Sequence, residues 1–165
     1  MDQVSPTMPN RRINFVPAQA GEVLQLYGGS TCRVMEDGSR TDNRIGSAEF
    51  VIPAKTSGPP AHWHEMHDET FLVTEGTIRF HAPDGTHIDA KAGDYVVVPT
   101  RAPHTFSNPT DVEAKFFNTF TPAYYVHYFK LVEAMGSEGR GVGKEEVLEA
   151  MSRFATVPAK EFVVQ

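Results

Sequence analysis

The chain has 165 residues and a formal net charge of −6, which suits one domain built around one core. This acidic balance argues against nucleic acid and anionic membranes as partners, because both favour a basic surface. The sequence has no apolar run long enough to span a bilayer, and its single cysteine, Cys32, excludes an internal disulfide. The N-terminal residues lack the basic start and apolar core of a secretory signal, so we expect a cytoplasmic protein.

The chain begins with an arm and continues as a series of short strands. Residues 1–22 begin with a proline-containing stretch and an arginine pair, and we expect an N-terminal arm that is either disordered or packed on a partner subunit. Beyond the arm, short apolar runs alternate with turns, which predicts a β-sandwich or β-barrel in which Cys32 is a small buried residue. The predicted strands cover residues 23–27, 31–35, 47–54, 71–74, 77–90 (a hairpin), 95–98 and 113–120.

The pattern changes towards the C-terminus. The run at 95–98 is apolar on both faces, which predicts a central strand. Residues 124–135 and 144–154 then have apolar side chains at helical spacing, separated by a glycine-rich loop. We therefore expect a β-barrel at 23–122 and a helical C-terminal extension at 123–165 that covers one opening or edge of the barrel.

The stretch from Gly58 to Gly76 carries the residues with the clearest chemistry. His62 and His64 are one residue apart, so on a strand both side chains point to the same face and their ring nitrogens can converge. A nearby carboxylate could add a third type of metal ligand. On an unbroken strand Asp68 would share the histidine face, so Glu69 can face inward only if the chain bends after His64. Glu65 is a further candidate for the carboxylate.

Two motifs in this chain resemble the signature motifs of the cupin superfamily. The first is His62-x-His64, four residues, Glu69, six residues and Gly76, with a short lead-in from Gly58. The second keeps every spacing of its motif but has Arg101 where the motif has glycine, a departure that concerns the local turn more than the metal ligand. Its matching residues are Gly93, Pro99, His104 and Asn108. The resemblance covers roughly residues 45 to 130 and is greatest to the small, single-domain quercetin-dioxygenase-like cupins.

The resemblance implies an all-β fold: a cupin jelly-roll β-barrel of six to eight antiparallel strands, here with a short helical C-terminal extension. It also implies that His62, His64, Glu69 and His104 bind one metal ion. Three imidazoles and one carboxylate suit Fe, Ni, Mn, Co, Cu or Zn, and the ligand set does not choose among them. An octahedral ion would keep two positions open for substrate and for O₂ or water, whereas a structural zinc site would be closed by its four ligands.

A closed barrel would place a predominantly apolar cavity beside this metal. Plain core packing explains each lining residue on its own, but together they predict a cavity suited to a flat aromatic or enolic molecule. The expected substrate pocket consists of Phe50, Ile52, Phe71, Val73, Phe106, Phe116, Asn118 and Phe120, with Asn118 the one polar member.

Three functions remain open. By similarity to quercetin dioxygenases, the first is oxygenation of a phenolic or enolic small molecule, with O₂ as co-substrate and Glu69 as both ligand and catalytic proton acceptor. The second is a non-redox isomerase, lyase or decarboxylase in which the metal stabilises an enolate. The third is a metal-stabilised small-molecule binding module without turnover. Oxygen uptake separates the first two, and a Glu69→Gln variant that keeps every property would favour the third.

The remaining histidines and the single tryptophan carry weaker expectations. His67 either supports the ligands or is exposed, and His81 and His87 flank a turn where we expect both to be solvated. His127 either faces a pocket or packs within its helix. Trp63 points away from the two neighbouring histidines, which suggests packing on the outer barrel face or on a second subunit, and we expect a homodimer.

Overall fold

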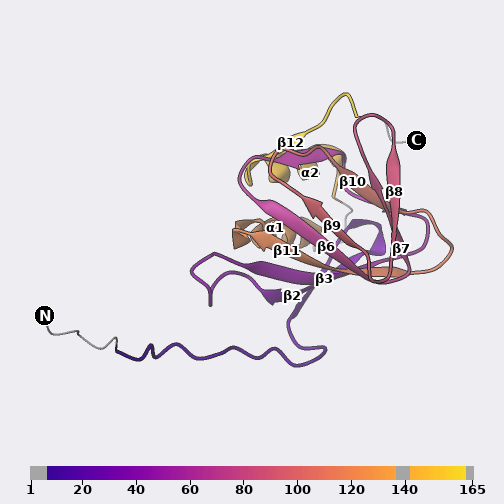
Figure 1. The fold of residues 1–165 in the computed structure, drawn as a ribbon. Coiled ribbons are helices and arrows are strands. Elements are labelled where there is room, and N and C mark those ends of the chain that lie inside the picture. The colour runs from indigo at the N-terminus through magenta and orange to yellow at the C-terminus, as the bar shows by residue number, and fades with distance from the viewer. Residues whose placement is uncertain (1–6, 137–141, 163–165) are drawn as a thin grey trace, which may run out of the picture.

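The computed structural model describes residues 7–136 and 142–162, and its architecture is dominated by two antiparallel sheets (Figure 1). The larger sheet contains, in spatial order, β1 (Glu22–Gln25), β2 (Thr31–Glu36), β3 (Gly46–Ile52), β11 (Ala114–Thr121), β6 (Asp68–Glu75) and β9 (Tyr95–Val98). The smaller sheet contains β4 (Thr56–Ser57), β10 (Thr105–Asn108), β7 (Thr77–His81) and β8 (His87–Lys91). The all-β barrel expected from the sequence is therefore confirmed.

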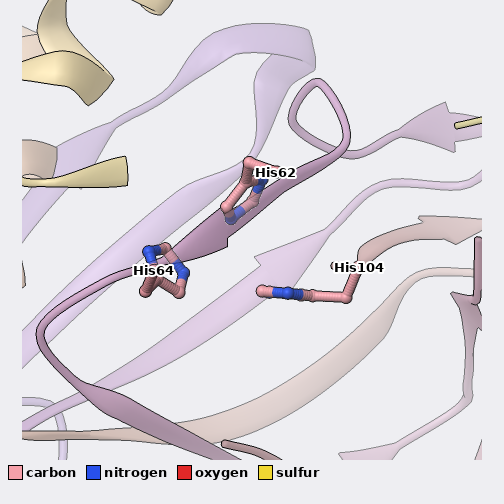
Figure 2. A group of neighbouring side chains, drawn as sticks. All are labelled: His62, His64 and His104. Atoms are coloured by element: carbon pink, nitrogen blue, oxygen red, sulfur yellow. The ribbon is translucent and has the colours of Figure 1, made fainter. Parts of the chain in front are cut away.

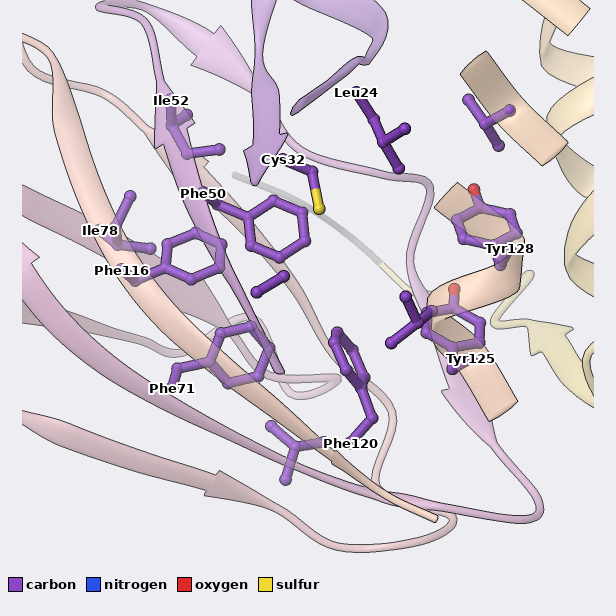
Figure 3. Packing of buried hydrophobic residues seen from close by; sticks show 14 of the residues in the cluster. Leu24, Cys32, Phe50, Ile52, Phe71, Ile78, Phe116, Phe120, Tyr125 and Tyr128 are labelled. Atoms are coloured by element: carbon purple, nitrogen blue, oxygen red, sulfur yellow. The ribbon is translucent and has the colours of Figure 1, made fainter. Parts of the chain in front are cut away.

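The core lies between the two sheets and is rich in aromatic side chains (Figure 3). Strands β3 and β11 alternate between buried and half-buried residues, as strands with one face on a core should. Phe50 and Phe116 stack across them with ring centroids 5.0 Å apart, and Phe106 of the smaller sheet meets Phe116 at 5.3 Å. Cys32 is fully buried in this core, where burial raises the pKa of its thiol.

The C-terminal part forms the two expected helices and one strand that was not expected. A 3₁₀ turn, η2 (Ala123–Tyr125), leads into α1 (Val126–Gly136), and α2 (Lys144–Ser152) follows. The chain then forms β12 (Thr156–Pro158), which pairs with β5 (His62–His64) as a separate two-stranded sheet. Three residues carry too little periodicity to predict such a strand. Among the described residues, no helix has the length and apolar character needed to cross a membrane.

Two predicted segments fall partly outside the described residues. Residues 1–6 of the arm and residues 137–141 of the glycine-rich loop belong to this group. The described part of the arm, from residue 7 to about residue 16, runs away from the barrel and is mostly exposed (Figure 1).

Strand β9 is an edge strand, so the prediction of a central strand at 95–98 was wrong. Within the described part of the chain it pairs only with β6, and its Tyr95 and Val97 are 59% and 57% exposed. A strand with apolar residues on both faces can still lie at the edge of a sheet, because this pattern does not determine how many strands pair with it. Here the outward-facing residues form an exposed apolar surface together with Leu72 of β6.

The turn before His104 keeps its shape although Arg101 replaces the motif glycine. Arg101 adopts a left-handed backbone conformation with φ of 68°, which costs a non-glycine residue about 1–2 kcal/mol. Its backbone N–H donates a hydrogen bond of 2.8 Å to the carbonyl of His64, so the turn also supports the His-x-His strand. At Gly76 of the first motif, φ is 70° and a side chain would collide with the Glu113 carbonyl, which explains that glycine.

Candidate metal centre

The three histidines of the predicted site meet in one place (Figure 2). His62 and His64 lie on the buried face of β5, with the half-buried Trp63 between them. His104 lies beside His62 because the two residues exchange backbone hydrogen bonds of 2.8 and 3.0 Å. Ligand nitrogens of the three side chains all lie within 4.8 Å of one another, and all three residues are buried. Backbone pairing between distant segments thus builds this cluster.

Glu69 joins the cluster because the chain bends between His64 and Glu69, as the sequence analysis required. Residues 65–67 separate β5 from β6, after which Glu69 faces inward and Asp68 outward. The Glu69 Oε1 atom lies 3.3 Å from His64 Nε2, and Oε2 lies 3.7 Å from His104 Nε2. The competing carboxylates are engaged elsewhere: Asp68 accepts hydrogen bonds from Thr100, and Glu65 accepts one from the Trp63 indole.

His67 is a member of the site that the sequence interpretation left undecided. It is buried, its Nε2 lies at hydrogen-bonding distance, 3.3 Å, from Glu69 Oε1, and its ring stacks on Tyr125. His64, His67 and Glu69 form a second group whose ligand atoms lie within 4.8 Å of one another. His67 belongs to the bend at residues 65–67, just before β6, so strand alternation does not predict its position and its closeness to Glu69 in the sequence was the one available signal.

The Nδ1 atom of each histidine ligand has its own partner. His62 Nδ1 lies 2.7 Å from the Pro60 carbonyl, and His104 Nδ1 lies 3.0 Å from the Ala102 carbonyl. A carbonyl can only accept, so Nδ1 carries the proton in both rings and Nε2 keeps its lone pair. His64 Nδ1 is held at 2.9 Å by the hydroxyl of Thr156. This arrangement is the one that metal-binding histidines use.

The residues present fit a divalent metal ion. Despite its short distance to Glu69, His64 Nε2 is fully buried and makes no hydrogen bond with any described residue, which costs about 1–3 kcal/mol for a polar group. A bound cation would satisfy this atom. Three imidazoles and a carboxylate are also a donor set that transition metals accept. His62, His64, Glu69 and His104 are therefore the residues that would hold the ion.

Burial shapes the protonation of this cluster. It lowers the pKa of His62 well below its usual range, and the neighbouring His104 and His64 add to the effect. The pKa of His64 is also lowered by burial, although Glu69 opposes the change. Burial alone would raise the pKa of Glu69, but the surrounding imidazoles outweigh it and hold that pKa well below its usual value. At neutral pH His62 and His64 are therefore neutral and Glu69 is ionised, as metal binding requires.

We expect the metal-free protein to lose stability as the pH falls below about 6.5. The pKa values of His62 and His64 are lower in the folded than in the unfolded chain, so the unfolded chain takes up protons first. Each histidine then reduces the free energy of unfolding by up to about 1.4 kcal/mol per pH unit. Urea unfolding with a chelator at pH 7.5, 6.5 and 5.5 measures this slope. The slope should be smaller in His62→Ala, and a stability that rises towards pH 5.5 would contradict the assignment.

A mostly apolar cavity opens beside the cluster. Its walls include His62, Glu69 and His104. Of the predicted pocket residues, six line this cavity: Phe50, Ile52, Phe71, Phe106, Phe116 and Asn118. Val73 and Phe120 are fully buried but are not among the lining residues. None of the described residues that line the cavity is a lysine or an arginine.

Segments outside the predicted pocket complete the cavity. Tyr125 of η2 and Tyr128 and Phe129 of α1 close one side, and Leu26 and Tyr27 contribute from the N-terminal part. The helical spacing of these aromatic residues led us to expect an extension that covers one opening or edge of the barrel, but not that its aromatic residues line the cavity. Burial raises the pKa of the Tyr125 and Tyr128 hydroxyls, so both remain protonated.

The other histidines and Trp63 lie outside the cluster. The expectation that His81 is solvated was wrong, because β10 covers it and its Nε2 lies 2.9 Å from the Ser107 hydroxyl. His87 is exposed, and His127 is half-buried with its ring next to Tyr124. Trp63 lies beside Val157 of β12, which covers part of the outer face on which we expected Trp63 to pack.

Comparisons with known proteins agree with this architecture. Residues 48–120 match the cupin domain family, whereas no curated protein matches the chain in sequence. Three solved structures of similar fold cover most of this chain. An RmlC-like cupin from Shewanella frigidimarina is 20% identical, with a TM-score of 0.59 over 70% of this chain and 96% of that one.

The other two come from different bacteria. The polyketide cyclase RemF from Streptomyces resistomycificus is 19% identical, with a TM-score of 0.59 over 74% of this chain and 96% of that one. A cupin 2 conserved barrel domain protein from Salinispora arenicola is 18% identical, with a TM-score of 0.55 over 73% and 98%. At these identities the likeness concerns the fold alone. The matched segment, residues 48–120, is thus similar to the cupin domain family, and the barrel and the buried histidines agree with that similarity.

Proposed function

We propose that this protein is a metal-dependent enzyme that acts on a small aromatic or enolic molecule, with oxygenation as the leading reaction. The observation that carries the proposal is the position of the cluster: His62, Glu69 and His104 form part of the wall of an otherwise mostly apolar cavity. A purely structural ion would need neither this opening nor the aromatic lining. The quercetin-dioxygenase-like branch of the superfamily is the variety of cupin that we propose.

The lining of the cavity favours a substrate with little charge. Among its described lining residues there is no lysine or arginine to pair with a phosphate or a second carboxylate, whereas the aromatic rings offer flat walls. Phe50, Phe71 and Phe116 line the cavity, and the ring of Phe116 packs against those of Phe50 and Phe71 with centroids 5.0 and 5.3 Å apart (Figure 3). The substrate would therefore be held mainly by apolar contact and by one oxygen directed at the metal site.

Glu69 is the residue best placed to move a proton. Its Oε1 atom is close to both His64 and His67, which leaves Oε2 the less engaged oxygen. An ionised carboxylate in this position can accept the proton of a phenol, an enol or a carbon next to a carbonyl at Oε2. The bound metal would supply a positive charge that stabilises the resulting oxyanion and, for a redox metal, a site for O₂. His67 holds the carboxylate in place during this transfer.

A non-redox reaction on the same kind of substrate is the second candidate. The pairing of Glu69 with the buried His67 favours it, because an acid–base pair next to a cation is what enolate chemistry requires. Isomerisation, elimination or decarboxylation through an enolate would need the same residues and no oxygen. A binding module without turnover remains the third possibility.

Oxygen consumption separates these functions. We expect the protein loaded with Fe(II), Mn(II) or Ni(II) to consume O₂ with at least one member of a panel of catechols, flavonols and β-diketones. Product formation without oxygen uptake, followed by chromatography under anaerobic conditions, would instead establish the non-redox reaction. Binding of panel members without any product in either atmosphere would contradict an enzymatic function.

A further inference from the structure

The three histidine ligands differ in how their rings are held. His62 and His104 each use a backbone carbonyl two residues earlier in the chain, so their partners come with the local backbone. His64 instead uses the hydroxyl of Thr156, which is 92 positions away in sequence. Thr156 lies on β12, beyond the segment that matches the cupin domain family. One ligand of the proposed metal site therefore depends on the C-terminal strand.

The hydroxyl of Thr156 has a defined hydrogen-bonding role. It donates to the carbonyl of Phe154 at 3.3 Å, so its lone pairs remain available to accept a hydrogen bond from His64 Nδ1 at 2.9 Å. Proton placement on Nδ1 leaves the Nε2 lone pair directed into the cluster. Nε2 is the buried atom that makes no hydrogen bond among the described residues. This tautomer is the one that a metal ion needs.

The backbone around Thr156 keeps the hydroxyl in this position. Strand β12 pairs with β5 so that Thr156 lies opposite His64, and Thr156 is 1% exposed. Two further backbone bonds fix the ends of the pairing, from Glu65 N–H to the Ala155 carbonyl and from Ala159 N–H to the Ala61 carbonyl. Ala155 itself has a φ of 50°, a strained conformation for a residue with a side chain. The turn into β12 is thus held by pairing along the whole His-x-His strand.

We infer that Thr156 is a positioning residue for the metal site, which sets the tautomer of His64 and couples docking of the C-terminal strand to metal binding. The inference rests on the proposed metal site. Coupling between two events is reciprocal, so a metal ion that binds to the ordered His64 must also stabilise the β5–β12 pairing. The part of the chain outside the matched domain would then set the metal affinity of that domain.

The first test uses the metal-free protein. Long-range ¹H–¹⁵N NMR spectra of the imidazoles should show His64 as the Nδ1–H tautomer in the wild type and in Thr156→Ser. In Thr156→Val the Nδ1–H form should lose population to the Nε2–H form, because the acceptor is gone. An Nε2–H tautomer of His64 in the wild type, or an unchanged tautomer in Thr156→Val, would overturn the inference.

The second test measures binding of Co²⁺ alone by competition with a chelator. Thr156→Val should bind Co²⁺ ~10–100-fold more weakly, the usual effect of losing an outer partner of a ligand, and Thr156→Ser should keep most of the affinity. Thr119→Val is a matched control, since it also removes a strand threonine hydroxyl that is hydrogen-bonded, there to Thr70. Its affinity should equal that of the wild type. Equal affinities for Thr156→Val and the wild type would overturn the inference.

If Thr156→Val does not fold, backbone amide hydrogen exchange of the wild type with and without Co²⁺ tests the coupling instead. Co²⁺ should slow exchange of the backbone amides of Val157 and Ala159, which face β5, and no change on metal binding would overturn the coupling. A wild-type protein that binds no Co²⁺ would overturn the proposed function and the coupling together. The tautomer of His64 in the metal-free protein is measured independently, so the two failures can be distinguished.

Discussion

Replacement of His104 by alanine is expected to weaken Co²⁺ binding by more than the ~100-fold that loss of an outer partner costs. His104 is a proposed direct ligand, and its backbone pairing with His62 places its ring next to the other two. The variant keeps this backbone pairing, because the exchanged hydrogen bonds do not involve the side chain. The affinity is measured by competition with a chelator, after circular dichroism has shown that the variant is folded.

His81→Ala is the matched control for this prediction. His81 and His104 are equally buried, at 7% exposure each, and both belong to the smaller-sheet side of the barrel. His81 hydrogen-bonds to Ser107 and is not a member of the metal cluster. Like His104→Ala, the control removes one buried imidazole, but it should bind Co²⁺ with wild-type affinity. Equal losses of affinity in the two variants would assign the effect to stability instead of ligation.

Glu69→Gln is expected to lower kcat about 10²- to 10⁴-fold on any substrate that the panel identifies, since the amide cannot accept the proton. The change preserves the size of the side chain, which is buried among three imidazoles. We also expect weaker Co²⁺ binding, because a neutral oxygen replaces an anionic ligand. Steady-state kinetics at saturating metal separates the catalytic loss from the loss of affinity.

Asp68→Asn provides the comparison for this substitution. Asp68 is adjacent in sequence but exposed, and its carboxylate accepts hydrogen bonds from the backbone and hydroxyl of Thr100. The variant should retain kcat and metal affinity within a few-fold of the wild type. A large loss in Asp68→Asn, with an active Glu69→Gln, would exchange the roles of the two carboxylates.

The sequence was most informative where chemistry and spacing act together. His62 and His64 share a face because strands alternate, and the cupin motifs added His104 at a distance that no local pattern could supply. The same motifs required a bend before Glu69, and the structure contains it at residues 65–67. Turn spacing predicted a β-sandwich or β-barrel, the resemblance to cupins favoured the barrel, and helical periodicity predicted both C-terminal helices.

The features that were missed depend on tertiary neighbours. β9 resembles a central strand by composition, yet it pairs on one side only. β12 has three residues, and what makes it a strand is the free edge of β5 rather than its own sequence. His81 appeared to be solvated because it flanks a turn, whereas β10 covers it. In each case the deciding partner is far away in sequence and has no local signature.

The central claim is that three histidines and one glutamate converge on a single metal ion. Titration of chelator-treated protein with Co²⁺, followed by ¹H NMR, tests it most directly. We expect saturation at about one equivalent of Co²⁺ per chain and three strongly shifted, solvent-exchangeable signals from the Nδ1–H groups of His62, His64 and His104. Two such signals would indicate the alternative group of His64, His67 and Glu69, and the absence of shifted signals would contradict a metal centre in this cavity.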